Sequence, residues 1–317
     1  AGYIGSCCSE YLLDHGHEVM VFDSLVKGHR EAVDPRARFV QGDLADPESI
    51  DRALSVGSRV DGVIHFAAFI DVRESMVDPG RYFRNNVANG LNLVNAAVKH
   101  GIPKIVFSST AATYGMPEAI PIPETCPTCP VNAYGDSKLM FERVLHWYRE
   151  VHGLEYVALR YFNAAGATAT RGEDHNPESH LIPIVLKTAL GQRDSVKVFG
   201  TDYPTPDGTC IRDYVHVTDL AQAHLLALQK PVHGAFNLGS GSGYSVREII
   251  DQAKRLTGCD FAVEEAPRRP GDPPRLVSDS TAARTVLGWR PTHDSVAEII
   301  GSAWHWHSMH PTGYASR

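Results

Sequence analysis

Apolar positions along the chain alternate between short continuous runs and longer stretches with helical spacing. In two long segments, 79–100 and 134–151, apolar residues recur every three or four positions, which is typical of amphipathic helices. Strands that alternate with helices form a parallel sheet covered on both faces. We therefore predict an α/β fold with a doubly wound parallel sheet. The runs with the length of buried strands are 18–22, 38–41, 62–66, 104–108 and 156–160.

Residue types also mark where several helices begin. Asp46-Pro47 and Asp78-Pro79 each place a carboxylate that can cap a helix just before a proline suited to its first turn. Ser245 is followed three residues later by Glu248, the pattern of a capping box. These positions predict helices that start at residues 47, 79 and 246.

The first residues contain a short glycine motif. Gly2-x-x-Gly5 leads into a helical pattern over Ser6–His15, and the strand that follows ends at Asp23. Glycines let the backbone approach a pyrophosphate, which the helix N-terminus stabilises. A carboxylate at the next strand end accepts hydrogen bonds from ribose hydroxyls and repels a 2′-phosphate, so NAD is favoured over NADP. A tight turn without a ligand is the alternative.

The glycine motif and the change in texture along the chain together predict the domains. We expect a Rossmann-like NAD-binding domain over 1–165, truncated at its N-terminus because the strand before Gly2 is missing. After residue 165 the elements become shorter and richer in Gly, Pro and Asp. This region, 166–317, is predicted to be a smaller α/β substrate-binding part, some of whose segments return to the main sheet.

A tyrosine and a lysine share one face of the helix predicted over 134–151. Tyr134 and Lys138 stand four residues apart, and Ser108-Ser109-Thr110 ends the preceding strand at the carboxyl edge of the sheet. A phenol with a pKa of about 10 is a poor base at neutral pH. An ammonium about 4 Å away can lower that pKa by about 3. We predict Tyr134 as the base, Lys138 as its electrostatic partner and Thr110 as a ligand of the reacting oxygen.

Composition restricts the partners and the location. The 317 residues carry a formal net charge of −7, which argues against nucleic acid as a partner. No apolar run is long enough to span a bilayer and no signal peptide is visible, so we expect a cytoplasmic protein without a membrane partner. Cys126 and Cys129 have metal-like spacing but no second cysteine pair, and we predict no metal site.

These motifs resemble those of the extended short-chain dehydrogenases, and within them the sugar-nucleotide 4-epimerases. Further matching segments are Asn85-Asn86-Val87, Arg160–Asn163 and Arg268–Asp272, so the resemblance covers essentially the whole chain. It implies that C4 of a UDP-hexose is oxidised and then reduced again by retained NAD, which interconverts UDP-galactose and UDP-glucose. It also implies a homodimer formed through helices 79–100 and 134–151.

The resemblance further implies which residues hold the two ligands. Those expected at the cofactor are Gly2, Tyr3, Ile4, Gly5, Asp23, Ser24, Asp43, Leu44, Phe66, Ala67, Ala68, Asn86, Ser108, Tyr134, Lys138 and Tyr161. Those expected at the substrate are Thr110, Tyr134, Asn163, His180, Leu181, Val198, Phe199, Arg212, Arg269 and Asp272.

Some positions separate the possible reactions. Ala111 and Ala112 stand where related dehydratases and decarboxylases place an acidic residue, which favours epimerisation. Ile70 stands near a position where some members have lysine, and Leu276 falls at the gate of the sugar pocket. The alternatives left open are a 4-epimerase of UDP-GlcNAc or a UDP-pentose, a sugar-nucleotide dehydratase or reductase, and an inactive NAD-binding fragment.

Overall fold

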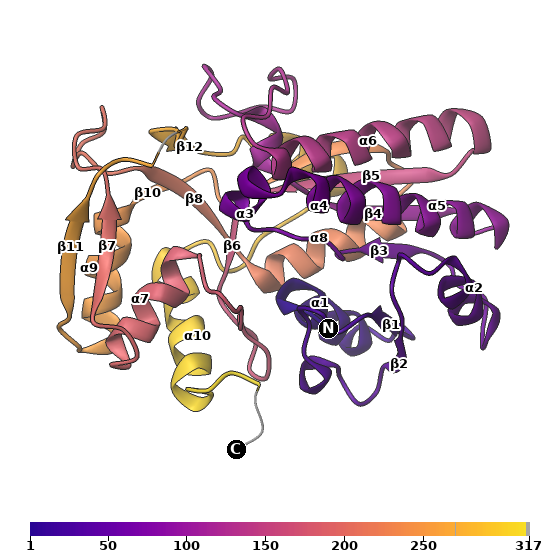
Figure 1. The fold of residues 1–317 in the computed structure, drawn as a ribbon, viewed down its shortest axis with the longest axis horizontal. Helices are drawn as coiled ribbons and strands as arrows, with labels where there is room; N and C mark the ends of the chain where they lie inside the picture. Colours follow the sequence, from indigo (N-terminus) through magenta and orange to yellow (C-terminus); the bar gives the residue numbers. More distant parts are fainter. Residues whose placement is uncertain (270, 315–317) are drawn as a thin grey trace.

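The computed structural model describes residues 1–269 and 271–314 (Figure 1). Its main sheet has four parallel strands in the order β3-β4-β5-β9, and β1 and β2 form a separate parallel pair. The predicted α/β fold with a parallel sheet is confirmed. The strands are β1 (Met20–Asp23), β2 (Arg38–Gln41), β3 (Val63–His65), β4 (Lys104–Thr110), β5 (Glu155–Tyr161) and β9 (Gly234–Leu238).

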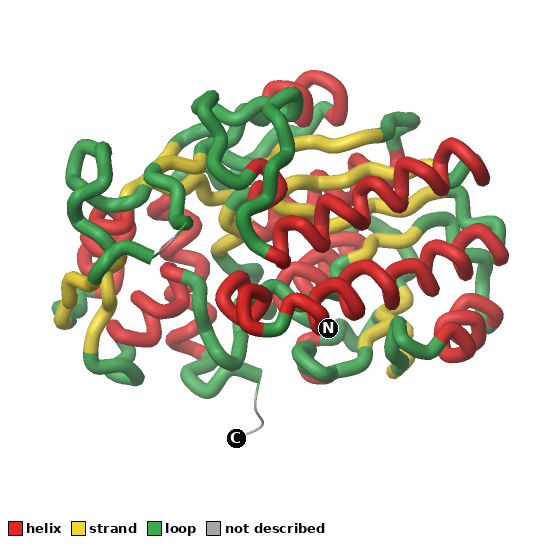
Figure 2. The backbone as a smooth tube through the Cα atoms, turned by 45° about the horizontal axis from the view of Figure 1, so that its top comes forward, coloured by secondary structure: helices red, strands yellow, loops and turns green. Residues whose placement is uncertain are grey.

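Helices cover both faces of the main sheet (Figure 2), and strand β4 shows why. Ile105 and Phe107 pack with α5 and α6, whereas Val106 belongs to the core that includes α8. Successive side chains of a strand point to opposite faces, so a strand covered on both sides is apolar at every position. The helices of this part are α1 (Tyr3–Asp14), α2 (Pro47–Ser55), α3 (Val72–Val77), α4 (Pro79–Phe83), α5 (Asn89–Lys99), α6 (Ala133–His152) and α8 (Val217–Gln229).

Most predicted helix ends agree with the structure. Asp46 and Asp78 cap α2 and α4, and Ser245 with Glu248 forms a complete capping box. Helix α6 begins after Asn132, whose side chain accepts a hydrogen bond from the amide of Gly135 at 2.8 Å. The helix predicted over 79–100 is interrupted by a π-helical segment between α4 and α5. The short helical segments are η1 (Arg30–Ala32), η2 (Arg84–Ala88), η3 (Ala111–Tyr114) and η4 (Ala283–Leu287).

The smaller part has its own core between three helices and short strands (Figure 1). Strand β8 pairs with β6, β10 and β12, and β7 pairs in parallel with β11. Its strands are β6 (Asn163–Ala165), β7 (Ser195–Phe199), β8 (Ile211–His216), β10 (Gly243–Ser245), β11 (Ala262–Ala266) and β12 (Arg275–Leu276). Its helices are α7 (Leu181–Ala189), α9 (Val246–Thr257) and α10 (Val296–Met309).

The chain passes between the two parts more than once. After β8 it enters α8, which packs beside α1, and then β9, which pairs with β5 at the edge of the main sheet. Within the described residues, β1 and β3 are not hydrogen-bonded to each other. A strand ahead of Gly2 and a domain division at residue 165 stay predictions. No helix among the described residues has the length and apolar character needed to cross a membrane.

Candidate active site

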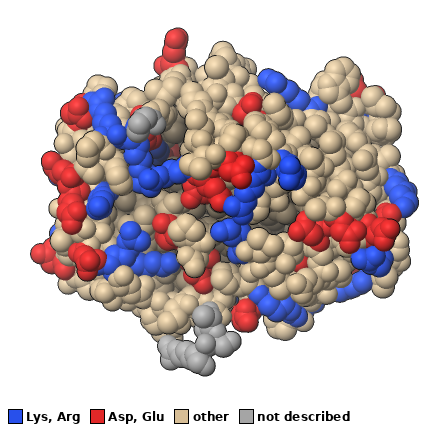
Figure 3. Space-filling model, in the orientation of Figure 1, with Lys and Arg blue, Asp and Glu red and all other residues tan. Residues whose placement is uncertain are grey.

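A large cavity of about 3050 Å³ lies along the carboxyl ends of the strands of the main sheet and is closed on its other side by the smaller part. This volume exceeds the 300–1,000 Å³ that is usual for a ligand pocket. The lining includes Met20, Val21, Val63 and Ile64, because the cavity extends between β1 and β3, two described strands that are not hydrogen-bonded to each other. Figure 3 shows charged side chains of both signs gathered around the middle of the molecule on one face.

The predicted glycine motif forms the start of α1 at this cavity. Gly2 is the N-cap residue of α1, and because it has no side chain it leaves the first amide groups of the helix uncapped. A Cβ placed on Gly2 would meet no atom within 4 Å, so the space in front of the helix is open. A Cβ on Gly5 would lie 3.5 Å from the ring of Phe66. Amide groups in the first turn of a helix lack partners within the helix and face ligands there. The motif therefore forms an open cradle that could hold a diphosphate.

Two carboxylates lie at the ends of β1 and β2 on the same wall: Asp23 is the last residue of β1, and Asp43 follows β2. Asp23 accepts a hydrogen bond from the amide of Leu25 at 2.7 Å and from the amino group of Ala1 at 3.0 Å. Asp43 accepts from the amide of Ala45 at 2.8 Å. Leu25 has a φ of +62°, a left-handed conformation that turns the chain sharply after the strand. The acidic groups that the sequence predicts for the cofactor thus line the cavity beside the glycine motif.

The predicted catalytic side chains meet where β4 and α6 approach each other. The Nζ of Lys138 donates a hydrogen bond to the carbonyl of Ser108 at 2.8 Å and lies 4.8 Å from the ring centre of Phe107. Tyr134, Lys138 and Thr110 all line the cavity. Tyr134 is the first α6 residue after Ala133, which brings its phenol to the carboxyl edge of the sheet.

Burial shifts the pKa values of Tyr134 and Lys138, and the shift of Tyr134 is opposite to the one predicted from the sequence. It raises the pKa of Tyr134, and a hydrogen bond with Thr110 offsets only part of that rise. It also lowers the pKa of Lys138 from 10.5 to about 7, although the charge of Glu142 acts the other way. The predicted lowering of the Tyr134 pKa by Lys138 is not seen, because burial of the phenol outweighs its hydrogen bond, and the Nζ of Lys138 donates to the Ser108 carbonyl.

A buried ionic network behind these groups was not predicted from the sequence. Arg160 on β5 donates to Glu142 on α6 at 2.6 and 3.0 Å and to the hydroxyl of Tyr114 at 2.9 Å. Glu142 also accepts a hydrogen bond from Ser109 on β4. The network connects α6 to the strands that carry the candidate catalytic residues.

Tyr161, predicted at the cofactor, lines the cavity and is buried, with its hydroxyl hydrogen-bonded to His224 on α8.

The predicted substrate residues lie on the opposite side of the cavity. Arg212 forms an ion pair with Asp272 and donates to the carbonyl of Ile211 at 2.8 Å. The guanidinium carbon of Arg269 lies 3.9 Å from the ring centre of Phe199. These basic side chains form the end of the cavity that can hold a second phosphate-bearing ligand. Asn163, His180 and Leu181 also line the cavity.

Two predicted site residues do not line the cavity. Val198 is 1% exposed and packs in the core of the smaller part. Asn86 is buried, where its side chain exchanges hydrogen bonds with the backbone of Phe69 at 2.9 and 3.0 Å and donates to Ser137 at 3.0 Å. Asn86 therefore holds the loop after β3 against α6, and a direct contact with the cofactor stays a prediction.

A further basic residue, which the sequence does not predict, lies at the cavity. Arg73 on α3 is exposed, lines the cavity and makes no side-chain hydrogen bond or ion pair with any described residue. Burial lowers the pKa of Arg269, and the positive charge of Arg73 lowers it further, so the two guanidinium groups face the same space. In the sequence, Val72-Arg73-Glu74 has only the character of a solvated helix turn, which gives no signal of this position.

Comparison with known proteins agrees with this geometry. Residues 1–239 match the model of the NAD dependent epimerase/dehydratase family. The chain is 50% identical to UDP-glucose 4-epimerase of Lacticaseibacillus casei, over 100% of this chain and 97% of that protein. It is 52% identical to UDP-glucose 4-epimerase of Streptococcus mutans, again over 100% of this chain and 97% of that protein.

Solved structures give the same result. A crystal structure of UDP-glucose 4-epimerase superposes with a TM-score of 0.97 and 46% identity, covering 100% of this chain and 98% of the other. UDP-glucose 4-epimerase from Brucella ovis in complex with NAD has a TM-score of 0.92 and 44% identity, with 96% and 95% covered. Because the family model and the full-length relatives agree with the parallel sheet and the glycine cradle, the chain belongs to the NAD-dependent epimerase/dehydratase family.

Proposed function

We propose that this protein interconverts UDP-galactose and UDP-glucose by inverting the configuration at C4 of the sugar. The observation that carries the proposal is one cavity with three different walls. The glycine cradle and Asp23 form the first, Tyr134 with Lys138 and Thr110 the second, and the arginine-rich end the third. UDP-glucose 4-epimerases that are about 50% identical over their full length support the same activity.

The cofactor end of the cavity fits NAD. The first turn of α1 and Gly2 offer room and amide groups to a diphosphate, and Asp23 offers a carboxylate to the ribose hydroxyls of NAD. When bound, NAD supplies the acceptor, and afterwards the donor, of the hydride that C4 loses and regains. We also assign Ser24, Asp43, Leu44, Ala67, Ala68 and Ser108, which line this region, to the cofactor.

The chain itself moves the proton of the reaction. Breaking the C4–H bond to give a ketone requires that O4 lose its proton. Tyr134 accepts this proton in its ionised form, which the positive charge of the nicotinamide would favour when NAD is bound, while Thr110 holds O4 by a hydrogen bond. On the return step Tyr134 gives the proton back to O4 as C4 regains its hydride on the opposite face. The sugar and the cofactor thus end in their starting oxidation states. Lys138 keeps the Ser108 end of β4 fixed beside the phenol.

The other wall holds the nucleotide while the sugar turns. Arg212, oriented by its ion pair with Asp272, and Arg269 neutralise the diphosphate, which provides a firm pivot. Phe199, Asn163, His180 and Leu181 line this part of the cavity and complete the proposed UDP site, and Val198, next to Phe199 in β7, supports it from the core of the smaller part. A loosely held keto sugar can then present either face to the same hydride donor.

Epimerisation is favoured over elimination because the site lacks a suitable extra acid. Positions 111 and 112, directly after Thr110, are alanines. The nearby Glu142 is 9% exposed and already paired with Arg160 and Ser109, so it is not available for proton transfer at the sugar. Leu276, at the expected gate of the sugar pocket, packs against the cluster around Tyr114 and Phe162. Because leucine is larger than the small side chains that would leave room for an N-acetyl group, we propose hexoses without that group as the preferred substrates.

A homodimer through α6 is part of the proposal. Met140, Trp147 and Val151 are 38, 64 and 68% exposed on this helix, although apolar side chains of this size favour burial. Their spacing of seven and four residues places them along one side of the helix. A cytoplasmic location also stays a prediction.

Incubation of the protein with UDP-galactose, followed by NMR of the sugar protons, tests the activity. We expect UDP-glucose to form to equilibrium without added reductant. The Tyr134→Phe variant should lose conversion and still bind NAD, whereas Tyr148→Phe on the same helix should stay active, because the Tyr148 hydroxyl contacts only Asn95 among the described side chains. Loss of water from the sugar would indicate a dehydratase, and full turnover by Tyr134→Phe would remove that residue as the base.

A further inference from the structure

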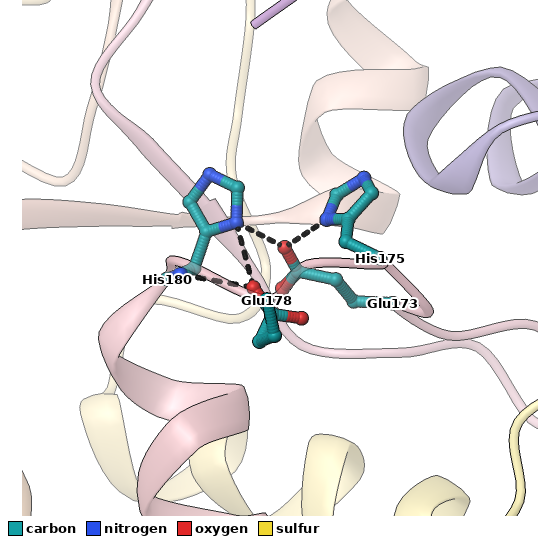
Figure 4. A group of neighbouring side chains, drawn as sticks. All are labelled: Glu173, His175, Glu178 and His180. Carbon is teal, nitrogen blue, oxygen red and sulfur yellow. Dashed lines mark hydrogen bonds and ion pairs between the residues drawn. The ribbon is translucent and has the colours of Figure 1, made fainter. Parts of the chain in front are cut away.

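Four side chains of one loop between β6 and α7 converge at the edge of the cavity (Figure 4). Glu173, His175, Glu178 and His180 each offer one oxygen or nitrogen atom, and these atoms all lie within 4.8 Å of one another. None of them has a part in the proton transfer at Tyr134. His180 is also assigned to the proposed UDP site, but the convergence of all four side chains is a feature that this assignment does not explain.

The contacts within this cluster concentrate on a few atoms. The Nδ1 atoms of His175 and His180 lie 3.0 and 2.8 Å from the same oxygen of Glu173. The Nδ1 of His180 also lies 3.1 Å from Oε1 of Glu178. In a tetrahedral site with bonds near 2.1 Å, ligand atoms stand about 3.4 Å apart. The observed spacing is therefore close to that of a ligand set around one ion.

The two carboxylates of the cluster are almost fully buried, and one of their oxygens has no partner in the part of the chain that the structure describes. The side chains of Glu173 and Glu178 are only 5 and 3% exposed. The Oε2 of Glu178 is buried and has no hydrogen-bond partner among the described residues. A buried carboxylate with an unpaired oxygen is unfavourable unless a cation neutralises it.

We propose that this cluster binds one divalent transition-metal ion, with Zn²⁺ preferred. Two imidazole nitrogens with two carboxylate oxygens suit Zn²⁺ better than Mg²⁺ or Ca²⁺, which select oxygen ligands. A metal ion binds imidazoles in their deprotonated, neutral form, so the two carboxylates would balance the charge of the ion. This proposal revises the sequence prediction that the chain has no metal site.

The position of the cluster gives such an ion a structural role. Its loop is held against the cofactor-binding part, where Lys27 donates to the carbonyl of Asn176 at 3.1 Å and His29 contacts Asp174. His180 is also the N-cap residue of α7, the helix that begins with Leu181. An ion at the cluster therefore fixes the loop that joins the cofactor wall to the start of the proposed UDP wall. Four protein ligands close the site, as in structural zinc sites.

Metal binding is measured on tag-free, full-length protein that has been treated with EDTA and dialysed. Titration with Co²⁺ should produce the visible absorption of a tetrahedral site and saturate at one equivalent, and ZnCl₂ should displace the Co²⁺. The double variant His175→Gln with His180→Gln should lose this binding. The matched control, His146→Gln with His152→Gln, removes two exposed histidines of α6 and should bind as the unchanged protein does.

A second variant covers the case in which the double variant does not fold. Glu178→Gln keeps the shape of the side chain and removes its charge. We expect the affinity of this variant for Zn²⁺ to fall by more than roughly tenfold, because losing even a residue that only supports a metal ligand lowers metal affinity by about that much. The proposal is overturned if the unchanged protein takes up no Co²⁺ or Zn²⁺, since the cluster is then only a set of histidine–glutamate ion pairs. Equal uptake by the His175/His180 double variant, or undiminished affinity in Glu178→Gln, overturns it as well.

Discussion

Replacing Lys138 with methionine should stabilise the fold, although Lys138 is one of the candidate catalytic residues. Lys138 is 2% exposed, and among the described residues its ammonium donates only to the Ser108 carbonyl. The nearest carboxylate, Glu142, is already occupied by Arg160 and Ser109. The ammonium is thus buried with little compensation, a form of strain that persists where function requires it.

The magnitude follows from the change in its pKa. The pKa falls from 10.5 to about 7 on folding, so burial opposes the charged form by about 5 kcal/mol at 1.36 kcal/mol for each pKa unit. Methionine has a similar length and carries no charge, and it gives up the hydrogen bond to Ser108, worth roughly 1 to 3 kcal/mol. We expect Lys138→Met to be more stable than the unchanged protein by roughly 2 to 4 kcal/mol at pH 7.

The sign of the pH dependence is fixed by the lowered pKa. Between pH 7 and 10.5 the unfolded chain holds a proton on Lys138 that the folded chain has released, so the stability of the unchanged protein rises with pH. The destabilisation by Lys138 is complete below about pH 7 and disappears above about pH 10.5. The advantage of Lys138→Met should therefore shrink by roughly 2 to 3 kcal/mol between pH 7 and 9.

Urea unfolding of both proteins at pH 7 and pH 9, followed by circular dichroism, measures this difference. Lys99→Met is the matched control, because the Lys99 side chain is 64% exposed and its ammonium stays in water. Its stability relative to the unchanged protein should not depend on pH. A Lys138→Met protein that is less stable than the unchanged one, or an advantage that does not change from pH 7 to pH 9, would refute the reasoning.

Two further substitutions test the arginine-rich wall and the buried network. Arg73→Gln should raise KM for UDP-galactose about tenfold, equivalent to about 1.4 kcal/mol of lost binding, with little change in kcat. The control Arg52→Gln, which lies away from the cavity, should change neither constant. An unaltered KM for Arg73→Gln would exclude a contact between Arg73 and the phosphates. Glu142→Gln leaves the guanidinium of Arg160 buried without a counter-charge and should lower the free energy of unfolding by roughly 3 to 5 kcal/mol. Urea unfolding measures it, and a loss no larger than that of the exposed Glu150→Gln would contradict the assigned role.

The sequence by itself determined the local elements and the faces they bury. Strand β4 is apolar at consecutive positions because both of its faces are covered, and Asp46 and Ser245 cap helices by contacts within three residues. Tyr134 and Lys138 share a face because four residues make about one helical turn. These features depend on backbone geometry and short-range hydrogen bonds, which the order of residues specifies directly.

Only the tertiary structure decided which distant groups meet and what burial does to them. Glu142 and Arg160 lie 18 residues apart, and Arg212 and Asp272 lie 60 apart, so no local pattern announces either pair. The lowered pKa of Lys138 comes from desolvation by elements that pack around it, which neither its identity nor its spacing reveals. Long-range pairing and dielectric environment are properties of the packed chain, and they are set only when the elements close on one another.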